Sequence, residues 1–174
     1  MPVTARSHSQ EGSRAPLAHT RSMTFERRRD SFSITTQRDR LDVDAIHAFL
    51  SQEAFWSLGV PRSVVETAIE HSLCFGLFED DAQIGFTRVV TDRATFAWIC
   101  DVYVLAPYRG RGLARWMIDS VLEHPDLAGL RRILLATRDA HGLYRQCGFE
   151  PLPNPDRWMI IADPDVYRRK GGGS

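Results

Sequence analysis

The chain has 174 residues, of which 43% are hydrophobic and 25% charged, and this composition predicts a single globular domain with a substantial core. Lysine plus arginine and aspartate plus glutamate number 22 each, so no overall positive field indicates a nucleic-acid-binding protein. No apolar run reaches the roughly 18 residues of a membrane-spanning helix, so a membrane protein is not expected either.

Residues 1–30 are rich in arginine, serine, threonine and proline and lack hydrophobic periodicity, which predicts a disordered N-terminal arm. They contain no apolar segment typical of a secretory signal, although a transit segment or a basic interaction arm stays open. We expect the folded domain to span residues 31–162 and residues 163–174 to form a C-terminal tail.

The first half of this domain shows one strand pattern and two helix patterns. Apolar residues alternate with polar ones over 32–36, which predicts a half-buried strand. Residues 41–52 carry apolar positions at helical spacing after Asp42, a favourable N-cap. Pro61 stands where a second helix can begin, before apolar positions within 64–69.

The connection between these two helices is aromatic and has no clean period. Phe55 and Trp56 lie in it, and their side chains can either line a substrate entrance or pack against the core. We keep both as candidate substrate contacts.

Three strand patterns follow, at 73–78, 83–91 and 94–105. Their short polar connections predict antiparallel neighbours. The third pattern is apolar at almost every position, which predicts a central strand covered on both faces. Asp101 is the one acidic residue within its apolar run.

The remaining pattern completes an α/β (or α+β) fold with a mixed, mostly antiparallel sheet and helices on both faces. The run Arg109–Gly112 precedes an amphipathic helix, and residues 133–136 predict a buried strand, parallel to its partner because a crossover precedes it. A short helix carries Tyr144 and ends at Gly148. Residues 158–161 predict a last strand.

A strand, a glycine turn and a helix N-terminus together predict an anion site, where Arg109 and Arg111 either add positive charge or are solvated loop residues. A dinucleotide fingerprint is excluded because the sixth position from Gly110 is Arg115, where close helix packing requires glycine or alanine. A P-loop is excluded because the only lysine of the chain is Lys170.

Two sequence motifs, the glycine turn followed by a tyrosine-containing motif, are more specific than a general anion site. The turn fits [Arg/Gln]-x-x-Gly-x-[Gly/Ala] at Arg109, Gly112 and Ala114, and residues 140–149 fit A-x-x-x-Y-x-x-x-G-F. Residues 32–161 therefore resemble the GNAT N-acetyltransferase superfamily, most closely its small bacterial single-domain members of unassigned substrate. The resemblance implies a GNAT-type sheet with a splayed parallel strand pair.

The resemblance further implies that acetyl-CoA is the cosubstrate and that no metal takes part. The backbone of Val102 and Val104 would pair with the pantetheine arm like an added strand. Backbone N–H groups of the glycine turn would hold the pyrophosphate. This implied pyrophosphate set comprises Arg109, Gly110, Arg111, Gly112, Leu113 and Ala114.

Tyr144 matches the family's tyrosine, which implies a position near the CoA sulfur and a role as general acid. The reference pKa of tyrosine, about 10, lies above that of a thiol, about 8.5, so the phenol is protonated when the thiolate leaves. A tyrosine that only packs under the cosubstrate stays an alternative.

The base is open. Asp101 can accept the amine proton, anchor the substrate, act through water, or form an ion pair with Arg88 or Arg138. Relatives often carry a glutamate or another base at the positions held here by Trp98 or Cys100, and neither of these residues supplies such a base. Trp98 and Cys100 are kept as candidate substrate contacts.

The three cysteines, Cys74, Cys100 and Cys147, are far apart and form neither a Cys-x-x-Cys nor a Cys/His pair. The sequence therefore predicts no disulfide framework and no metal site, and we expect a cytoplasmic protein.

The function expected from these features is an N-acetyltransferase that transfers acetyl from acetyl-CoA to a primary amine by direct attack in a ternary complex. The acceptor is a small-molecule or peptide amine, and no nucleic-acid or membrane partner is expected. Relatives are often dimers, which leaves a homodimer open. The alternatives are a non-catalytic acyl-CoA-binding or sensing module, and an interaction protein that uses the basic N-terminal arm.

Overall fold

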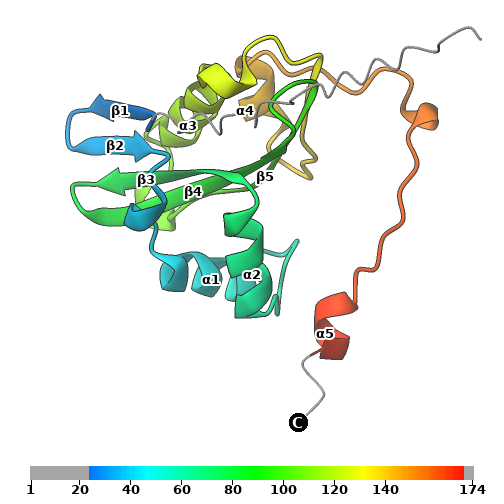
Figure 1. The fold of residues 1–174 in the computed structure, drawn as a ribbon, viewed down its shortest axis with the longest axis horizontal. Helices are drawn as coiled ribbons and strands as arrows, with labels where there is room; N and C mark the ends of the chain where they lie inside the picture. The colour runs from blue at the N-terminus through cyan, green and yellow to red at the C-terminus, as the bar shows by residue number, and fades with distance from the viewer. Residues whose placement is uncertain (1–23, 171–174) are drawn as a thin grey trace, which may run out of the picture.

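The computed structural model describes residues 24–170, which form a six-stranded sheet with helices on both faces (Figure 1). The strands lie side by side in chain order, and every pair is antiparallel except β5 and β6, which are parallel. The predicted fold class is therefore confirmed. The strands are β1 Glu26–Arg29, β2 Phe32–Thr35, β3 Leu73–Glu79, β4 Ala82–Thr91, β5 Phe96–Val104 and β6 Arg132–Leu134.

Two helices cover each face of the sheet, and a fifth follows at the end of the described chain. Helices α1 and α2 lie on one face, and α3 and α4 lie on the other (Figure 1). The helices are α1 Val43–Gln52, α2 Arg62–Glu70, α3 Leu113–Leu122, α4 His141–Gln146 and α5 Val166–Lys170, with 3-10 turns at Arg38–Arg40, Ala106–Tyr108, Pro125–Leu127 and Pro155–Arg157. None of the helices within residues 24–170 is long and apolar enough to cross a membrane.

Local signals explain where α1 begins and where α4 ends. The Asp42 carboxylate accepts a hydrogen bond from the Ala45 N–H at 2.9 Å, which confirms it as the N-cap of α1. No side chain caps α4, whose N-cap residue is Ala140; the Thr137 hydroxyl accepts from the Ala140 N–H at 3.0 Å in the turn before the helix. Gly148 follows α4 with φ 89°, in the left-handed region that ends many helices.

The structure corrects the start of the domain. Strand β1 pairs with β2, so the predicted boundary near Ser31 is too late. The segment Glu26–Arg29 is charged at every position and lies at the edge of the sheet, so it gives no alternation for sequence reasoning to detect. Residues 1–23 of the predicted arm lie outside the described residues.

Two further predictions need correction. Residues 158–161 are not a strand, because no neighbouring strand pairs with them. The N-terminal half of β5 is not covered on both faces, because Phe96 and Trp98 are exposed to 36% and 37%. Because β5 is apolar at almost every position, its sequence did not indicate that only one face of this half of the strand is buried.

Candidate active site

Strand β5 contains one residue more than its neighbour can pair with. Phe86 and Arg88 are two residues apart on β4, but their partners on β5, Tyr103 and Cys100, are three apart. Asp101 lies within this bulge and has φ 55°, a left-handed conformation that aspartate tolerates better than most residues. A bulge bends its strand and leaves a residue out of the hydrogen-bonded ladder.

The sheet opens at the same level. Strand β6 pairs with β5 only at Phe96, Ala97 and Trp98, whereas β5 continues to Val104. From Ile99 onward, the second edge of β5 therefore has no strand partner among residues 24–170. Free backbone groups along an extended edge can pair with an extended ligand as they would with another strand.

The glycine turn lies beyond the end of β5 and begins α3. Gly110 and Gly112 have φ 76° and 74°, and a Cβ atom at either position would meet nothing within 4 Å. The Trp116 N–H bonds to the Gly112 carbonyl, so the N–H groups of Leu113 and Ala114 precede the helical ladder. The turn is thus an exposed helix N-terminus with free donors, as expected for an anion site.

The two arginines of this turn point to different partners. The Arg109 Nε donates to the Val104 carbonyl at 2.8 Å, so part of the hydrogen-bonding capacity of Val104 is used within the chain. The Arg111 guanidinium lies 4.7 Å from the centre of the Phe32 ring and 4.0 Å from the Glu79 carboxylate. Neither side chain is simply a solvated loop charge.

Tyr144 lies on α4 with its ring buried against Phe149, which it meets edge-on at 5.9 Å between ring centroids. It lines a cavity of about 980 Å³ that also reaches Trp98 on β5 and Thr137 after β6. Burial raises the pKa of Tyr144 to about 12, so its hydroxyl is a permanent hydrogen-bond donor at neutral pH.

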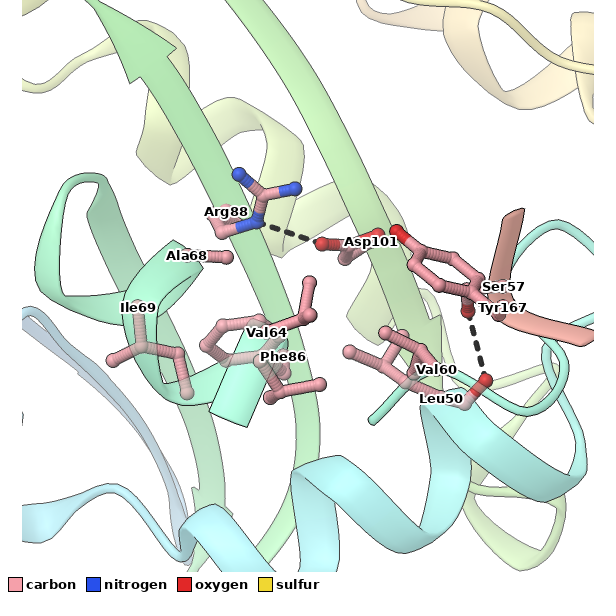
Figure 2. Close-up of a pocket in the computed structure, with 11 residues that line it drawn as sticks. Leu50, Ser57, Val60, Val64, Ala68, Ile69, Phe86, Arg88, Asp101 and Tyr167 are labelled. Atoms are coloured by element: carbon pink, nitrogen blue, oxygen red, sulfur yellow. Dashed lines mark hydrogen bonds and ion pairs between the residues drawn. The ribbon is translucent and has the colours of Figure 1, made fainter. Parts of the chain in front are cut away.

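Asp101 connects three parts of the molecule. Its Oδ2 accepts from the Arg88 Nε at 2.7 Å, and its Oδ1 accepts from the Trp56 Nε1 at 3.3 Å (Figure 2 shows the pair with Arg88). Arg88 also donates to the Ser72 hydroxyl at 3.2 Å. Burial disfavours the charge of Arg88, but the Asp101 carboxylate outweighs it and raises the pKa of Arg88.

This arrangement decides between the ion pairs left open for Asp101. Arg138 instead bonds to the Asp139 carboxylate at 3.4 Å, and its guanidinium lies 3.7 Å from the centre of the Phe55 ring. Arg88 is therefore the partner of Asp101. Both carboxylate oxygens of Asp101 are engaged, but a carboxylate has about four acceptor positions, so two donors leave room for another.

A second cavity, of about 60 Å³, lies beside Asp101 on the face covered by α1 and α2 (Figure 2). Its walls are mainly apolar, and Ser57, Arg88 and Asp101 provide the polar groups. Tyr167 of α5 completes the wall and points toward Asp101 in Figure 2. The apolar lining consists of Leu50, Val60, Val64, Val65, Ala68, Ile69 and Phe86.

The other candidate substrate residues lie around this centre. Phe55 and Trp56 stand half-exposed in the connection between α1 and α2, and Trp98 lines the larger cavity. The Cys100 thiol lies 3.4 Å from the Arg88 carbonyl, and burial raises the pKa of this thiol to about 12. A thiol that stays protonated is a poor nucleophile, and Cys100 is not among the residues that line either cavity.

Sequence reasoning missed three features of this site. It placed residues 163–174 in a tail, although Tyr167 packs into the smaller cavity. It also did not identify the bulge, for which an aspartate within an apolar strand was the available signal. The bond from Trp56 to Asp101 joins residues 45 positions apart and left no trace in local spacing.

Comparison with known proteins supports one family. The model of the acetyltransferase (GNAT) family matches residues 33–149. A Gibberella zeae protein described as an acetyltransferase is 33% identical over 138 residues, which cover 67% of this chain and 77% of that protein.

Solved structures show the same fold. A GNAT-family acetyltransferase of Xanthomonas campestris pv. campestris is 47% identical with a TM-score of 0.76, over 78% of this chain and 96% of that chain. A GNAT-family acetyltransferase of Elizabethkingia anophelis, solved with acetyl-CoA bound, is 11% identical with a TM-score of 0.56, over 72% and 80% of the two chains. The latter likeness concerns the fold alone.

Proposed function

The chain belongs to the acetyltransferase (GNAT) family, and on that premise we propose that it transfers the acetyl group of acetyl-CoA to a primary amine while both substrates are bound. The observation that carries this proposal is the open edge of β5 next to the bulge at Asp101. The edge lies between the glycine turn at one end and the cavity that holds Tyr144.

The order of these features along β5 matches the order of groups in acetyl-CoA. The pantetheine arm would pair with the backbone of Val102 and, through the capacity that Arg109 leaves free, of Val104. The pyrophosphate would accept hydrogen bonds from the turn between Arg109 and Ala114. The thioester would then lie near the bulge, and the proposed reaction needs no metal.

The reaction forms a bond between the amine nitrogen and the acetyl carbon and breaks the bond between that carbon and sulfur. Tyr144 would donate a hydrogen bond to the departing sulfur. With a pKa of about 12, however, its phenol holds the proton more tightly than a thiol of about 8.5. Complete transfer would be uphill by about 5 kcal/mol, at about 1.4 kcal/mol for each pKa unit. We therefore propose that Tyr144 stabilises the developing thiolate and that the amine supplies the proton that sulfur finally gains.

The acceptor would enter the smaller cavity. Asp101 keeps free acceptor positions there and can bind the N–H groups of an incoming amine, as an anchor or as a proton acceptor. The volume of about 60 Å³ and the apolar lining favour an amine carried on a short apolar group. A small-molecule amine meets this description, and so does an amine at the end of a peptide.

Thiol release from acetyl-CoA, measured over a panel of small amines and peptides, tests the activity. We expect turnover with some amines, intersecting initial-rate patterns, and no acetylated protein by intact mass when amine is omitted. Parallel patterns with an acetylated protein would contradict direct attack. Tight acetyl-CoA binding without turnover on any amine would indicate a binding or sensing module instead.

A further inference from the structure

Arg138 brings a cation to the acceptor side of the site. It follows Thr137, which lines the larger cavity, and its guanidinium carbon lies 3.7 Å from the centre of the Phe55 ring in the α1–α2 connection. Phe55 meets Trp56 edge-on at 5.1 Å between ring centroids, and Trp56 donates its indole N–H to Asp101. These contacts place Arg138 in the neighbourhood of the Asp101 carboxylate, although it comes from a different part of the chain, the connection between β6 and α4.

The guanidinium of Arg138 keeps most of its hydrogen-bond donors for a ligand. The contact with Phe55 uses the flat face of this group, whereas its N–H groups lie in the plane and point away from the ring. Within residues 24–170, its one hydrogen bond is to the Asp139 carboxylate at 3.4 Å, and the two side chains are exposed to 64% and 70%. A surface ion pair of this kind is weak, so Asp139 leaves Arg138 able to bind another anion.

Asp101 and Arg138 carry opposite charges but are not each other's partners. The Asp101 carboxylate is bound by Arg88 and Trp56, whereas the Arg138 guanidinium lies against Phe55. Asp101 therefore keeps acceptor positions for a ligand, and Arg138 keeps donors and a positive charge. A site with these two features is complementary to a ligand that carries both an amine and an anion.

We propose, on the basis of the amine acetylation proposed above, that the acceptor is an amino acid with a short apolar side chain and that Arg138 binds its carboxylate. The amine lies at Asp101, the apolar part occupies the cavity of about 60 Å³, and the carboxylate accepts two parallel hydrogen bonds from the guanidinium. A phosphate would bring nearly two negative charges next to Asp139, so the singly charged carboxylate is favoured.

Acceptor pairs that differ only in the carboxylate test this proposal. L-Alanine, L-valine and β-alanine are each compared with their carboxamides in initial-rate assays at saturating acetyl-CoA, and we expect the lowest KM to belong to an acid. Arg138→Gln should raise the KM of that acid about 10- to 100-fold, because a hydrogen bond to a charged group is lost, and should leave the KM of its amide unchanged. Arg93→Gln is the matched control, because Arg93 is also an exposed arginine paired with an aspartate and lines neither cavity, and it should change neither KM.

Calorimetry of the same acids and amides, with the protein saturated with CoA, separates this proposal from the proposed reaction, because CoA has no acetyl group to transfer. Arg138→Gln should weaken binding of the preferred acid by the same factor, and Arg93→Gln should not. Acid binding that requires Arg138 but leads to no acetylation would refute the proposed function and support the carboxylate site. Equal affinities for acid and amide in the natural protein, or acid binding that Arg138→Gln leaves unchanged, would overturn the role of Arg138 whatever the activity.

Discussion

Removing Arg88 tests whether the ion pair with Asp101 holds the acceptor side of the site together. We take Arg88→Met, which keeps much of the aliphatic length and removes the guanidinium. The side chains of Arg88 and Asp101 are exposed to only 19% and 13%, so the pair lies between a surface ion pair and a fully buried one. Breaking a buried pair costs about 3–5 kcal/mol and a surface pair about 0–1 kcal/mol.

Arg88→Met should therefore lower the free energy of unfolding by an intermediate amount, about 2–3 kcal/mol, because the Asp101 carboxylate loses its cation but keeps the Trp56 donor. For a domain of this size, about 1 kcal/mol lowers the melting temperature by about 2–4 °C, so a decrease of about 4–12 °C is expected. The double variant Arg88→Met with Asp101→Asn should lose less stability than the sum of the two single variants, by about 1–2 kcal/mol.

Urea unfolding at neutral pH, followed by circular dichroism, measures these differences as shifts of the midpoint at constant slope. Arg27→Met is the control, because Arg27 forms an ion pair with Glu123 in which the side chains are exposed to 32% and 60%. Its cost should stay below about 1 kcal/mol. The reasoning is refuted if Arg88→Met is no more destabilising than Arg27→Met, or if the two changes at the pair are additive.

Four further predictions concern the reaction and the binding of its two substrates. Tyr144→Phe removes the hydrogen-bond donor to the developing thiolate and should lower kcat about 10²- to 10³-fold while the KM for acetyl-CoA changes little, and an unchanged kcat would remove Tyr144 from the chemical step. Because burial raises the pKa of Tyr144 to about 12, the donor form persists below that value, and wild-type kcat should not decline between about pH 8 and 10.5. Gly112→Ala places a Cβ at φ 74°, which costs about 1 kcal/mol, and should weaken acetyl-CoA binding by displacing the turn. Gly59→Ala, at the same φ of 74°, should cost similar stability without that loss, so equal acetyl-CoA affinities by calorimetry would contradict the role of the turn. Tyr167→Ala should raise the KM for the amine but not for acetyl-CoA, and initial rates in which both rise equally would speak against its place in the acceptor wall.

The sequence predicted those parts of the fold that depend on local signals. A carboxylate at Asp42 can satisfy a free N–H of the next turn wherever the chain goes, so the start of α1 was predictable. The glycine turn was predictable because its signal is also local. Gly110 and Gly112 adopt a backbone conformation that few other residues accept. Two short motifs then identified the family before any contact was known.

What the sequence did not predict depends on partners that are distant in the chain. Residues 158–161 have the composition of a strand, but a strand exists only where a neighbouring edge accepts its hydrogen bonds. The charged β1 shows the converse, because it pairs with β2 without any apolar alternation. Similarly, Trp56 and Tyr167 reach the neighbourhood of Asp101 from a loop and from the last helix.

The presence of an acidic residue inside the apolar β5 follows from two demands that meet at one position. The backbone there must adopt φ 55° for the bulge, which branched and bulky apolar residues accept poorly. The side chain must also bind Arg88 and Trp56, which join β4 and the α1–α2 connection to β5. Glycine would satisfy the first demand and lose the second, whereas glutamate keeps the charge but lacks the tolerance of aspartate for this conformation. The bulge lies where the sheet opens, so this single residue couples the position of the acceptor cavity to that of the free β5 edge. A substitution that changes either the backbone conformation or the side-chain bonds of Asp101 should therefore affect both the cavity and the edge.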